Sequence, residues 1–178
     1  AEAYNNLGNA YKFKNDLENA LFYYRKALET NPQYADACYN LAILFNEIGR
    51  FQEAVTAYSH ALRLNPKMIE AHFNLGNILR ELGKLEEAIQ CYRKTLEINP
   101  DFAEAYNGLG TVYEEQGQLD KANASYRQHL RIKSDDGVTV KASLLMDVIC
   151  ESTQSIASNR DTIAGNIEVM DQRKLCLT

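Results

Sequence analysis

A pattern that recurs every 34 residues constrains this chain more than any other feature of its sequence. In residues 35–68 the pattern consists of Cys38, Leu41, Ala42, Phe45, Ala54, Tyr58, Ala61 and Pro66. The corresponding positions before and after this stretch hold similar residues, with no insertion. We therefore divide the first part of the chain into four repeats, residues 1–34, 35–68, 69–102 and 103–136, and number the positions of each repeat from 1 to 34.

Each repeat predicts two helices. Apolar residues at repeat positions 3, 7, 10 and 11 have helical spacing, as in Ala3, Leu7, Ala10 and Tyr11. Position 15, where the first helix is expected to end, holds residues that tolerate a left-handed backbone: Asn15, Gly49, Gly83 and Gly117. A second amphipathic pattern follows and stops at Asn-Pro in three repeats, because proline disfavours a helical conformation in the residue before it.

The period and the residue types at the eight positions resemble the tetratricopeptide repeat. The resemblance implies an all-α fold, a right-handed superhelical α-solenoid of four helical hairpins with a concave groove. Single hairpins cannot bury their apolar faces, so stability is expected to come from stacking of neighbours. The resemblance implies a protein or peptide ligand and no particular reaction.

Composition narrows the function classes. The formal charge of −5 and the pI near 5.3 disfavour a nucleic-acid surface, which usually carries a basic stripe. No apolar run approaches the roughly 18 residues needed to span a bilayer, so we expect a cytoplasmic protein without a membrane partner. The cysteines are too far apart for paired metal or redox spacing, and no catalytic motif is present. We predict no cofactor, no metal and no enzymatic activity in this stretch itself.

The period is lost after Gly137. Residues 138–150 are apolar and ambiguous between helix and strand, and Ser152 or Thr153 is a candidate cap for a further helix. The apolar side of that helix is expected to consist of Ile156, Ile163, Ile167 and Met170. We interpret residues 137–178 as a cap on the fourth repeat or a linker towards a missing downstream domain, and the chain as a piece of a longer protein.

This C-terminal stretch carries a second resemblance. The residues concerned are Asp135, Asp136, Gly137, Lys141, Ala142, Leu144, Leu145, Glu151, Ser152, Ile156 and Arg160. Their order is similar to the stretch that joins the repeats to the catalytic region in bacterial SPINDLY-like O-linked N-acetylglucosamine transferases, although prolines expected near Met146 are absent. Repeat proteins with methyltransferase or other glycosyltransferase modules remain alternatives.

Asparagine at repeat position 6 is the main candidate for a binding site. It occurs as Asn6, Asn40 and Asn74, and at Gly108 the series is broken beside Asn107. The family resemblance places positions 2, 5, 6, 9, 12 and 13 on the concave wall, where a carboxamide can donate to and accept from the backbone of an extended peptide. The alternative is that duplicated repeats simply retain duplicated residues.

Further polar residues are expected to complete the floor of this groove. At positions 9 and 12 they are Asn9, Asn77, Lys12, Asn46 and Arg80. These residues make the N-terminal end partly basic. Glu47, Glu81, Glu114 and Glu115 are expected to make the other end acidic, although such charges are more often a solvated face.

Three functions remain open from the sequence. The first is a protein interaction module that holds an extended peptide or a partner helix in the concave groove. The second is the substrate-recognition arm of a larger O-linked N-acetylglucosamine transferase-like enzyme. The third is a self-association scaffold, a homo-oligomer formed through the uncapped N-terminal repeat.

Overall fold

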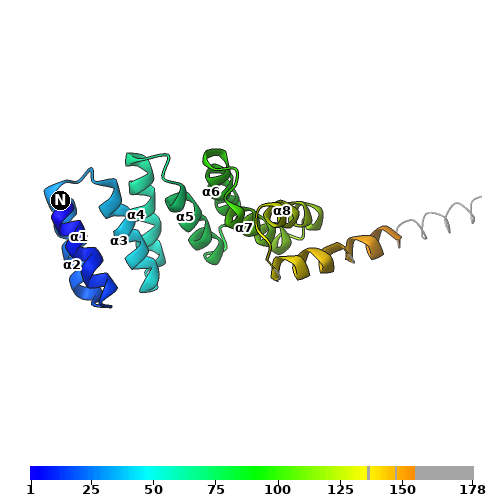
Figure 1. Cartoon of the computed structure of the whole chain (residues 1–178), viewed down its shortest axis with the longest axis horizontal. Coiled ribbons are helices and arrows are strands. Elements are labelled where there is room, and N and C mark those ends of the chain that lie inside the picture. Colours follow the sequence, from blue (N-terminus) through cyan, green and yellow to red (C-terminus); the bar gives the residue numbers. More distant parts are fainter. Residues whose placement is uncertain (136, 147, 155–178) are drawn as a thin grey trace, which may run out of the picture.

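The computed structural model describes residues 1–135, 137–146 and 148–154, and all regular secondary structure in these ranges is α-helical. The helices are α1 (Glu2–Phe13), α2 (Leu17–Thr30), α3 (Ala35–Glu47), α4 (Phe51–Leu64), α5 (Ile69–Glu81), α6 (Leu85–Ile98), α7 (Ala103–Glu115) and α8 (Leu119–Ile132). They form successive hairpins that follow one another along the long axis of the molecule (Figure 1). The predicted all-α solenoid of helical hairpins is confirmed.

The turn inside each hairpin has the predicted left-handed residue. Asn15 has a φ of 59°, and Gly49, Gly83 and Gly117 have φ values of 74°, 72° and 71°. No atom lies within 4 Å of a Cβ built on Gly49, so the backbone conformation, and not lack of space, favours glycine there. The first helix therefore ends where the sequence predicts.

The asparagine before each proline ends the second helix. Asn31, Asn65 and Asn99 are extended and follow the last helical residue. Each side chain accepts a hydrogen bond from the backbone N–H two residues further on, at 3.0 to 3.2 Å. This local turn complements the effect of proline, because it offers the backbone an alternative to continuing the helix.

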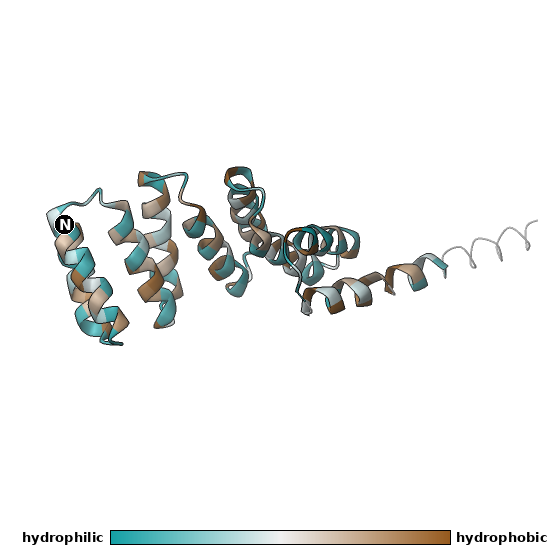
Figure 2. Cartoon of the chain, in the orientation of Figure 1, coloured by the Kyte–Doolittle hydropathy of each residue, from teal (hydrophilic) through white to brown (hydrophobic). Residues whose placement is uncertain are grey.

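The core of each hairpin is a tyrosine packed against small residues. Tyr24, Tyr58, Tyr92 and Tyr126, all at repeat position 24, are at most 1% exposed. A Cβ at Gly110 would lie 2.3 Å from the ring of Tyr126, and one at Gly8 would lie 2.5 Å from that of Tyr24. The first and second helices of these hairpins can approach so closely because position 8 lacks a side chain. Figure 2 shows hydrophilic and hydrophobic residues on every helix of the array, as amphipathic packing requires.

These buried tyrosines predict a loss of stability at alkaline pH. Burial raises the pKa of Tyr24 and of Tyr92 to about 12, against about 10 for an exposed phenol, and it also raises the pKa of Tyr58 and of Tyr126. A raised pKa in the folded state contributes stability below pH ~10 that is lost as the pH rises from about 10 to about 12.

We expect the final part of the phenolate absorbance change to coincide with loss of the helical circular dichroism signal in that range. Complete ionisation of all 11 tyrosines while the helical signal is unchanged would contradict this expectation. The Tyr24→Phe variant is the control, because it should remove one phenol from the late phase and leave the early phase unchanged.

The first helices of the hairpins lie on the inner side of the array. Helix α1 contacts α3 and α5 contacts α7, whereas neither α3 and α5 nor any two successive second helices of the described part are in comparable contact. Elements on the inside of a curved stack lie closer together than those on the outside. These contacts agree with the concave surface that the family resemblance predicts on α1, α3, α5 and α7.

Beyond α8 the chain is helical over residues 137–146 and 148–154, which resolves the ambiguity between helix and strand for those residues. Val138, Ala142 and Leu145 are buried, and the Asn123 side chain donates a 3.1 Å hydrogen bond to the carbonyl oxygen of Ala142. Asn123, which replaces an apolar residue of the repeat, thus binds the segment that follows α8. The assignment of residues 137–178 as a cap or a linker stays a prediction.

The predicted helix start at Ser152 or Thr153 is wrong. Both residues are helical, and their hydroxyl groups donate to the carbonyl oxygen of Ile149 at 2.9 and 2.8 Å. A serine or threonine hydroxyl inside a helix can bond in this way to a carbonyl of the preceding turn, and it then does not cap a helix start. Residues 156, 163, 167 and 170, expected on the apolar side of that helix, lie outside the described residues. None of the helices that the structure describes is long and apolar enough to cross a membrane.

Candidate functional site

The predicted groove residues all lie on the first helices of the hairpins. They are Asn6, Asn9 and Lys12 on α1, Asn40 and Asn46 on α3, Asn74, Asn77 and Arg80 on α5, and Asn107 on α7. Positions 6, 9 and 12 are three residues apart and share one helix face, and position 5 joins this face because it lies four residues before position 9. The most exposed members are Asn6 and Asn9, and the others are half-buried.

Side-chain hydrogen bonds join successive first helices, and in each the two partners are 35 residues apart in the sequence. The side-chain amide of Asn40 donates to Oδ1 of Asn5 at 2.9 Å, and that of Asn74 donates to the hydroxyl of Tyr39 at 3.4 Å. Position 6 of one repeat thus contacts position 5 of the repeat before it. The sequence analysis did not predict Asn5 and Tyr39 as partners of the asparagine row. They could have been found as the residues 35 positions before Asn40 and Asn74, which is one repeat length plus one residue.

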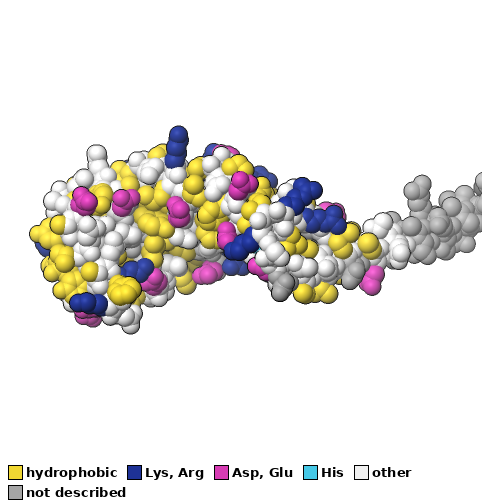
Figure 3. Space-filling model, in the orientation of Figure 1, with side chains coloured by type: hydrophobic (Ala, Val, Ile, Leu, Met, Phe, Trp, Pro, Cys, Tyr) yellow, Lys and Arg dark blue, Asp and Glu magenta, His cyan; other side chains and the backbone are white. Residues whose placement is uncertain are grey.

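Ion pairs follow the same step at the other end of these helices. Lys12 pairs with Glu47 at 2.7 Å and Arg80 with Glu115 at 3.4 Å. Asn46 occupies the corresponding position on α3, and in the described residues no ion pair joins α3 to α5. Two of the predicted bases are thus neutralised by acids of the next repeat, and the separation into a basic and an acidic end stays a prediction. Acidic and basic side chains are also interspersed on the face drawn in Figure 3.

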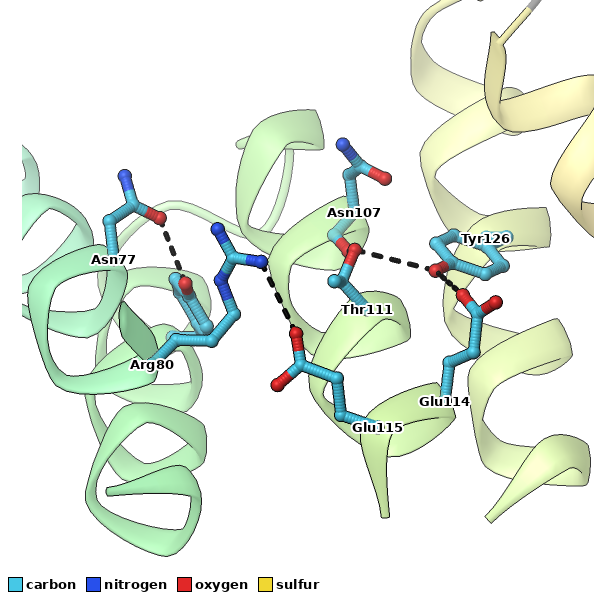
Figure 4. Close-up of polar contacts among 8 residues, drawn as sticks. Asn77, Arg80, Asn107, Thr111, Glu114, Glu115 and Tyr126 are labelled. Atoms are coloured by element: carbon cyan, nitrogen blue, oxygen red, sulfur yellow. Dashed lines mark hydrogen bonds and ion pairs between the residues drawn. The ribbon is translucent and has the colours of Figure 1, made fainter. Parts of the chain in front are cut away.

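Asparagines at position 9 accept hydrogen bonds from the buried tyrosines. The hydroxyl of Tyr24 donates to Oδ1 of Asn9, and that of Tyr92 to Oδ1 of Asn77, both at 2.8 Å. Figure 4 shows the Asn77 side chain in the second of these bonds. In the fourth repeat the hydroxyl of Tyr126 lies 2.7 Å from Oε2 of Glu114. Asn9 and Asn77 therefore have a structural role, because they satisfy the hydrogen-bonding groups of buried tyrosines.

A hollow of about 310 Å³ lies between α5 and α7. Three of the predicted residues, Asn77, Arg80 and Asn107, line it, together with Lys141 from the helix over residues 137–146. Oδ1 of Asn107 is buried and has no hydrogen-bond partner in the described residues. The hollow brings together three of the predicted site residues. Figure 4 shows their side chains.

The break of the asparagine series at Gly108 has a steric cause. A Cβ at Gly108 would lie 2.7 Å from Cζ of Tyr92, and one at Gly76 would lie 2.8 Å from Cε1 of the same ring. Tyr92 is thus enclosed by two glycines from successive repeats. An asparagine at residue 108 would require this buried ring to move.

The outer side of the array has a second, more apolar hollow of about 620 Å³ between α2, α3 and α4. In it Sγ of Cys38 lies 3.5 Å from Nδ1 of His60. Burial raises the pKa of the Cys38 thiol, so the sulfur stays protonated and weakly nucleophilic. Among the residues that the structure describes, no group of three or more His, Cys, Asp and Glu side chains is placed to hold a metal ion.

Family models match the whole repeat region. Tetratricopeptide repeat models match residues 1–34, 23–56 and 103–136, and a further TPR repeat model matches residues 44–79 and 76–117. The matches at 1–34 and 103–136 coincide with the first and fourth repeats defined by the sequence pattern.

Curated relatives match over single stretches. The chain is 43% identical over 53 residues to the uncharacterized protein MJ0572 of Methanocaldococcus jannaschii, which is 30% of this chain and 62% of that protein. It is 41% identical over 51 residues to the probable UDP-N-acetylglucosamine–peptide N-acetylglucosaminyltransferase SPINDLY of Petunia hybrida, 29% of this chain and 6% of that protein. The matched stretches thus span less than two thirds of these relatives.

Solved structures match over most of the chain. MamA of Desulfovibrio magneticus RS-1 superposes with a TM-score of 0.77 at 20% identity, covering 88% of this chain and 89% of that one. PilF of Pseudomonas aeruginosa gives a TM-score of 0.74 at 27% identity, with 84% and 69% covered. The likeness to MamA is one of fold.

Proposed function

This chain belongs to the tetratricopeptide repeat family of protein interaction modules, and we propose that it binds an extended peptide segment of a partner protein along α1, α3, α5 and α7. The observation that carries the proposal is the row of carboxamides at position 6, Asn6, Asn40 and Asn74, on the inner helices. Evenly repeated amides suit a peptide backbone, which also presents donors and acceptors at regular intervals.

The bonds between helices support this use of the row. The side-chain amide of Asn40 donates one N–H to Asn5, so its second N–H and its Oδ1 remain for a ligand. The same bond restricts the rotamer of Asn40, which lowers the entropy lost when a peptide binds. Asn74 is held in a similar way by Tyr39.

The proposal is tested with a random twelve-residue peptide library selected on the intact chain, followed by titration of an enriched peptide. We expect Asn40→Ala and Asn74→Ala each to weaken binding by about 3- to 10-fold, the loss of one or two peptide hydrogen bonds. Asn6→Ala should act in the same direction. The Gln128→Ala variant, which removes an exposed carboxamide from the second helix α8, is the surface control and should bind normally.

Asn5→Ala is the matched control for Asn40→Ala. It removes the same bond between helices and leaves the Asn40 carboxamide in place. If both variants weaken binding equally, the amide acts through packing and the proposed backbone contact is wrong. The proposal also fails if no peptide is enriched over an unrelated protein, or if the Asn6, Asn40 and Asn74 changes combined leave binding unaltered.

A second candidate function is supported by the SPINDLY relative. That protein is named as a probable peptide N-acetylglucosaminyltransferase, and it matches 51 residues of this chain at 41% identity. On this proposal the repeats present a substrate protein to a catalytic region encoded elsewhere in a longer reading frame. The coding sequence after Thr178 tests it, because a glycosyltransferase region is expected there and an unrelated sequence or a stop would contradict it.

Self-association is a third candidate. The first hairpin exposes Tyr4, Leu7 and Phe22 by 40 to 51%, which offers an apolar surface to a second copy. Sedimentation velocity at several concentrations tests it. A sedimentation coefficient that stays at the monomer value throughout would exclude this candidate.

A further inference from the structure

The helical stretch over residues 137–146 occupies the place of a further first helix after α7. Its buried residues Val138, Ala142 and Leu145 are four and three residues apart. Repeat positions 3, 7 and 10 have the same spacing, and they are buried in the same way on α3, α5 and α7, each of which packs against the second helix before it. Val138 therefore corresponds to position 3, although the 34-residue sequence pattern is lost in this part of the chain.

The position of Lys141 supports the same register. Lys141 corresponds to position 6, and its Nζ lies 5.7 Å from the ring centroid of Tyr126, the buried tyrosine of the preceding hairpin. Gly108, also at position 6, lies in a similar way against the buried tyrosine of the hairpin before it, because a Cβ built on Gly108 would lie 2.7 Å from Cζ of Tyr92. The row of first helices thus continues from α7 into residues 137–146.

This last member of the row exposes apolar residues, which we call the tail stripe. They are Val140, Leu144 and Val148, each four residues after the one before, and they are 49 to 60% exposed. In the register above they correspond to positions 5, 9 and 13. Position 5 is where one first helix contacts the next, as Asn5 does with Asn40. The tail stripe therefore lies where a following first helix would pack.

Helix α1 exposes a second apolar surface at the other end of the row, which we call the head stripe. It consists of Ala3, Leu7, Ala10 and Phe13, and Phe13 is 94% exposed. In the other three repeats positions 3, 7 and 10 are buried and position 13 is a glutamate. On α3 and α7 this glutamate pairs with a base of the preceding repeat. The head stripe thus includes the position through which a first helix contacts the repeat before it, with a phenylalanine in place of the acid.

We infer that the chain self-associates head to tail, with the tail stripe of one copy packed against the head stripe of the next. This inference rests on the self-association candidate of the proposed function and names its two surfaces. Both stripes are apolar, so their contact removes hydrocarbon from water without desolvating a charge. Phe13 is important here, because a glutamate at that position would enter the contact as an ion.

A second copy of the chain is the occupant that the arrangement favours. The two stripes lie at opposite ends of the long axis, so they cannot meet within one chain (Figure 1). The contact also continues the packing of first helices within the chain, as between α1 and α3 and between α5 and α7. Because the two surfaces differ, the contact is heterologous and leaves one free stripe at each end, which permits addition of further copies.

The experiment is sedimentation velocity on the intact chain and on two variants that each block one stripe. Phe13→Glu blocks the head stripe and gives α1 the acid of the other repeats, and Leu144→Glu blocks the tail stripe. We expect the wild type to form species larger than a dimer as its concentration rises. Each variant alone should raise the dissociation constant by about 10-fold or more, because a carboxylate would be buried in an apolar contact.

Mixing the two variants identifies the mode of contact. Phe13→Glu keeps its tail stripe and Leu144→Glu keeps its head stripe, so an equimolar mixture should form a heterodimer and nothing larger. Two identical surfaces in contact would instead let one variant dimerise alone. Phe22→Glu is the matched control, because it places the same charge on another exposed aromatic side chain of the first hairpin, outside both stripes, and should associate as the wild type does.

Each outcome supports or overturns the head-to-tail contact. If Leu144→Glu associates as the wild type does, the tail stripe is not used, so the inference is wrong and self-association stands. A mixture of the two variants that stays monomeric also overturns it. A wild type that stays monomeric at every concentration contradicts the self-association candidate itself. Val140→Glu, a second change at an exposed residue of the tail stripe, should act as Leu144→Glu does, so the result does not depend on the folding of one variant.

Discussion

Replacing Tyr92 with alanine is expected to lower the free energy of unfolding by about 3–5 kcal/mol, the cost of deleting a fully buried aromatic side chain and leaving a cavity. The ring is enclosed by Gly76 and Gly108, so no side chain at these two positions can move in to fill the space. The total free energy of unfolding of a typical domain is only about 5–15 kcal/mol. Urea denaturation followed by circular dichroism should show a large decrease in the midpoint.

Tyr92→Phe separates the ring from its hydroxyl group. It keeps the packing and removes the 2.8 Å hydrogen bond to Asn77, so we expect a loss of only about 0.5–1.5 kcal/mol. Equal losses for the alanine and phenylalanine variants would mean that the hydrogen bond, and not the packed ring, holds the third hairpin together. Hydrogen exchange should place the largest change in α5, α6 and α7, because repeats interact with their neighbours.

Gly110→Ala is expected to destabilise the fourth hairpin by about 1–3 kcal/mol through overpacking. The added Cβ would lie 2.3 Å from Cε1 and 2.5 Å from Cδ1 of Tyr126, a ring that is fully buried and held by Glu114. In an exposed helix the same change would stabilise, since alanine is the better helix former. The sign of the change in the urea midpoint therefore reports on the packing directly.

The matched control for this change is Gly137→Ala. A Cβ there would meet only Oδ1 of Asp135, at 3.3 Å, so this oxygen, which accepts a 3.1 Å hydrogen bond from the backbone N–H of Val138, needs to move by only a few tenths of an ångström. We expect a change within about 0.5 kcal/mol. A Gly110→Ala variant as stable as the wild type would show that α7 and α8 can separate without cost, which the close approach in the structure does not allow.

Position 8 of the second repeat shows how sequence and packing depend on each other. It holds Ala42 in place of glycine, and position 9 there is Ile43, which cannot accept a hydrogen bond from a tyrosine hydroxyl. In the other repeats position 8 is glycine, and the residue at position 9 lies within hydrogen-bond distance of the buried tyrosine hydroxyl. The two substitutions occur together in the one repeat that lacks this bond. The sequence alone shows both differences but not the link between them.

The repeat period and the turn residues by themselves determined the helix pairs, because both are local properties of the backbone. Helical spacing, a left-handed residue at position 15 and Asn-Pro at the end of the second helix act within a few residues of one another. The tertiary structure alone decided which polar residues are partners. Contacts between residues that are 35 apart in the sequence depend on how neighbouring hairpins pack against each other. No local sequence pattern therefore predicts the hydrogen bond from Asn40 to Asn5 or the ion pair between Lys12 and Glu47. The hollow between α5 and α7 also depends on tertiary packing, because residues of two successive repeats and Lys141 line it.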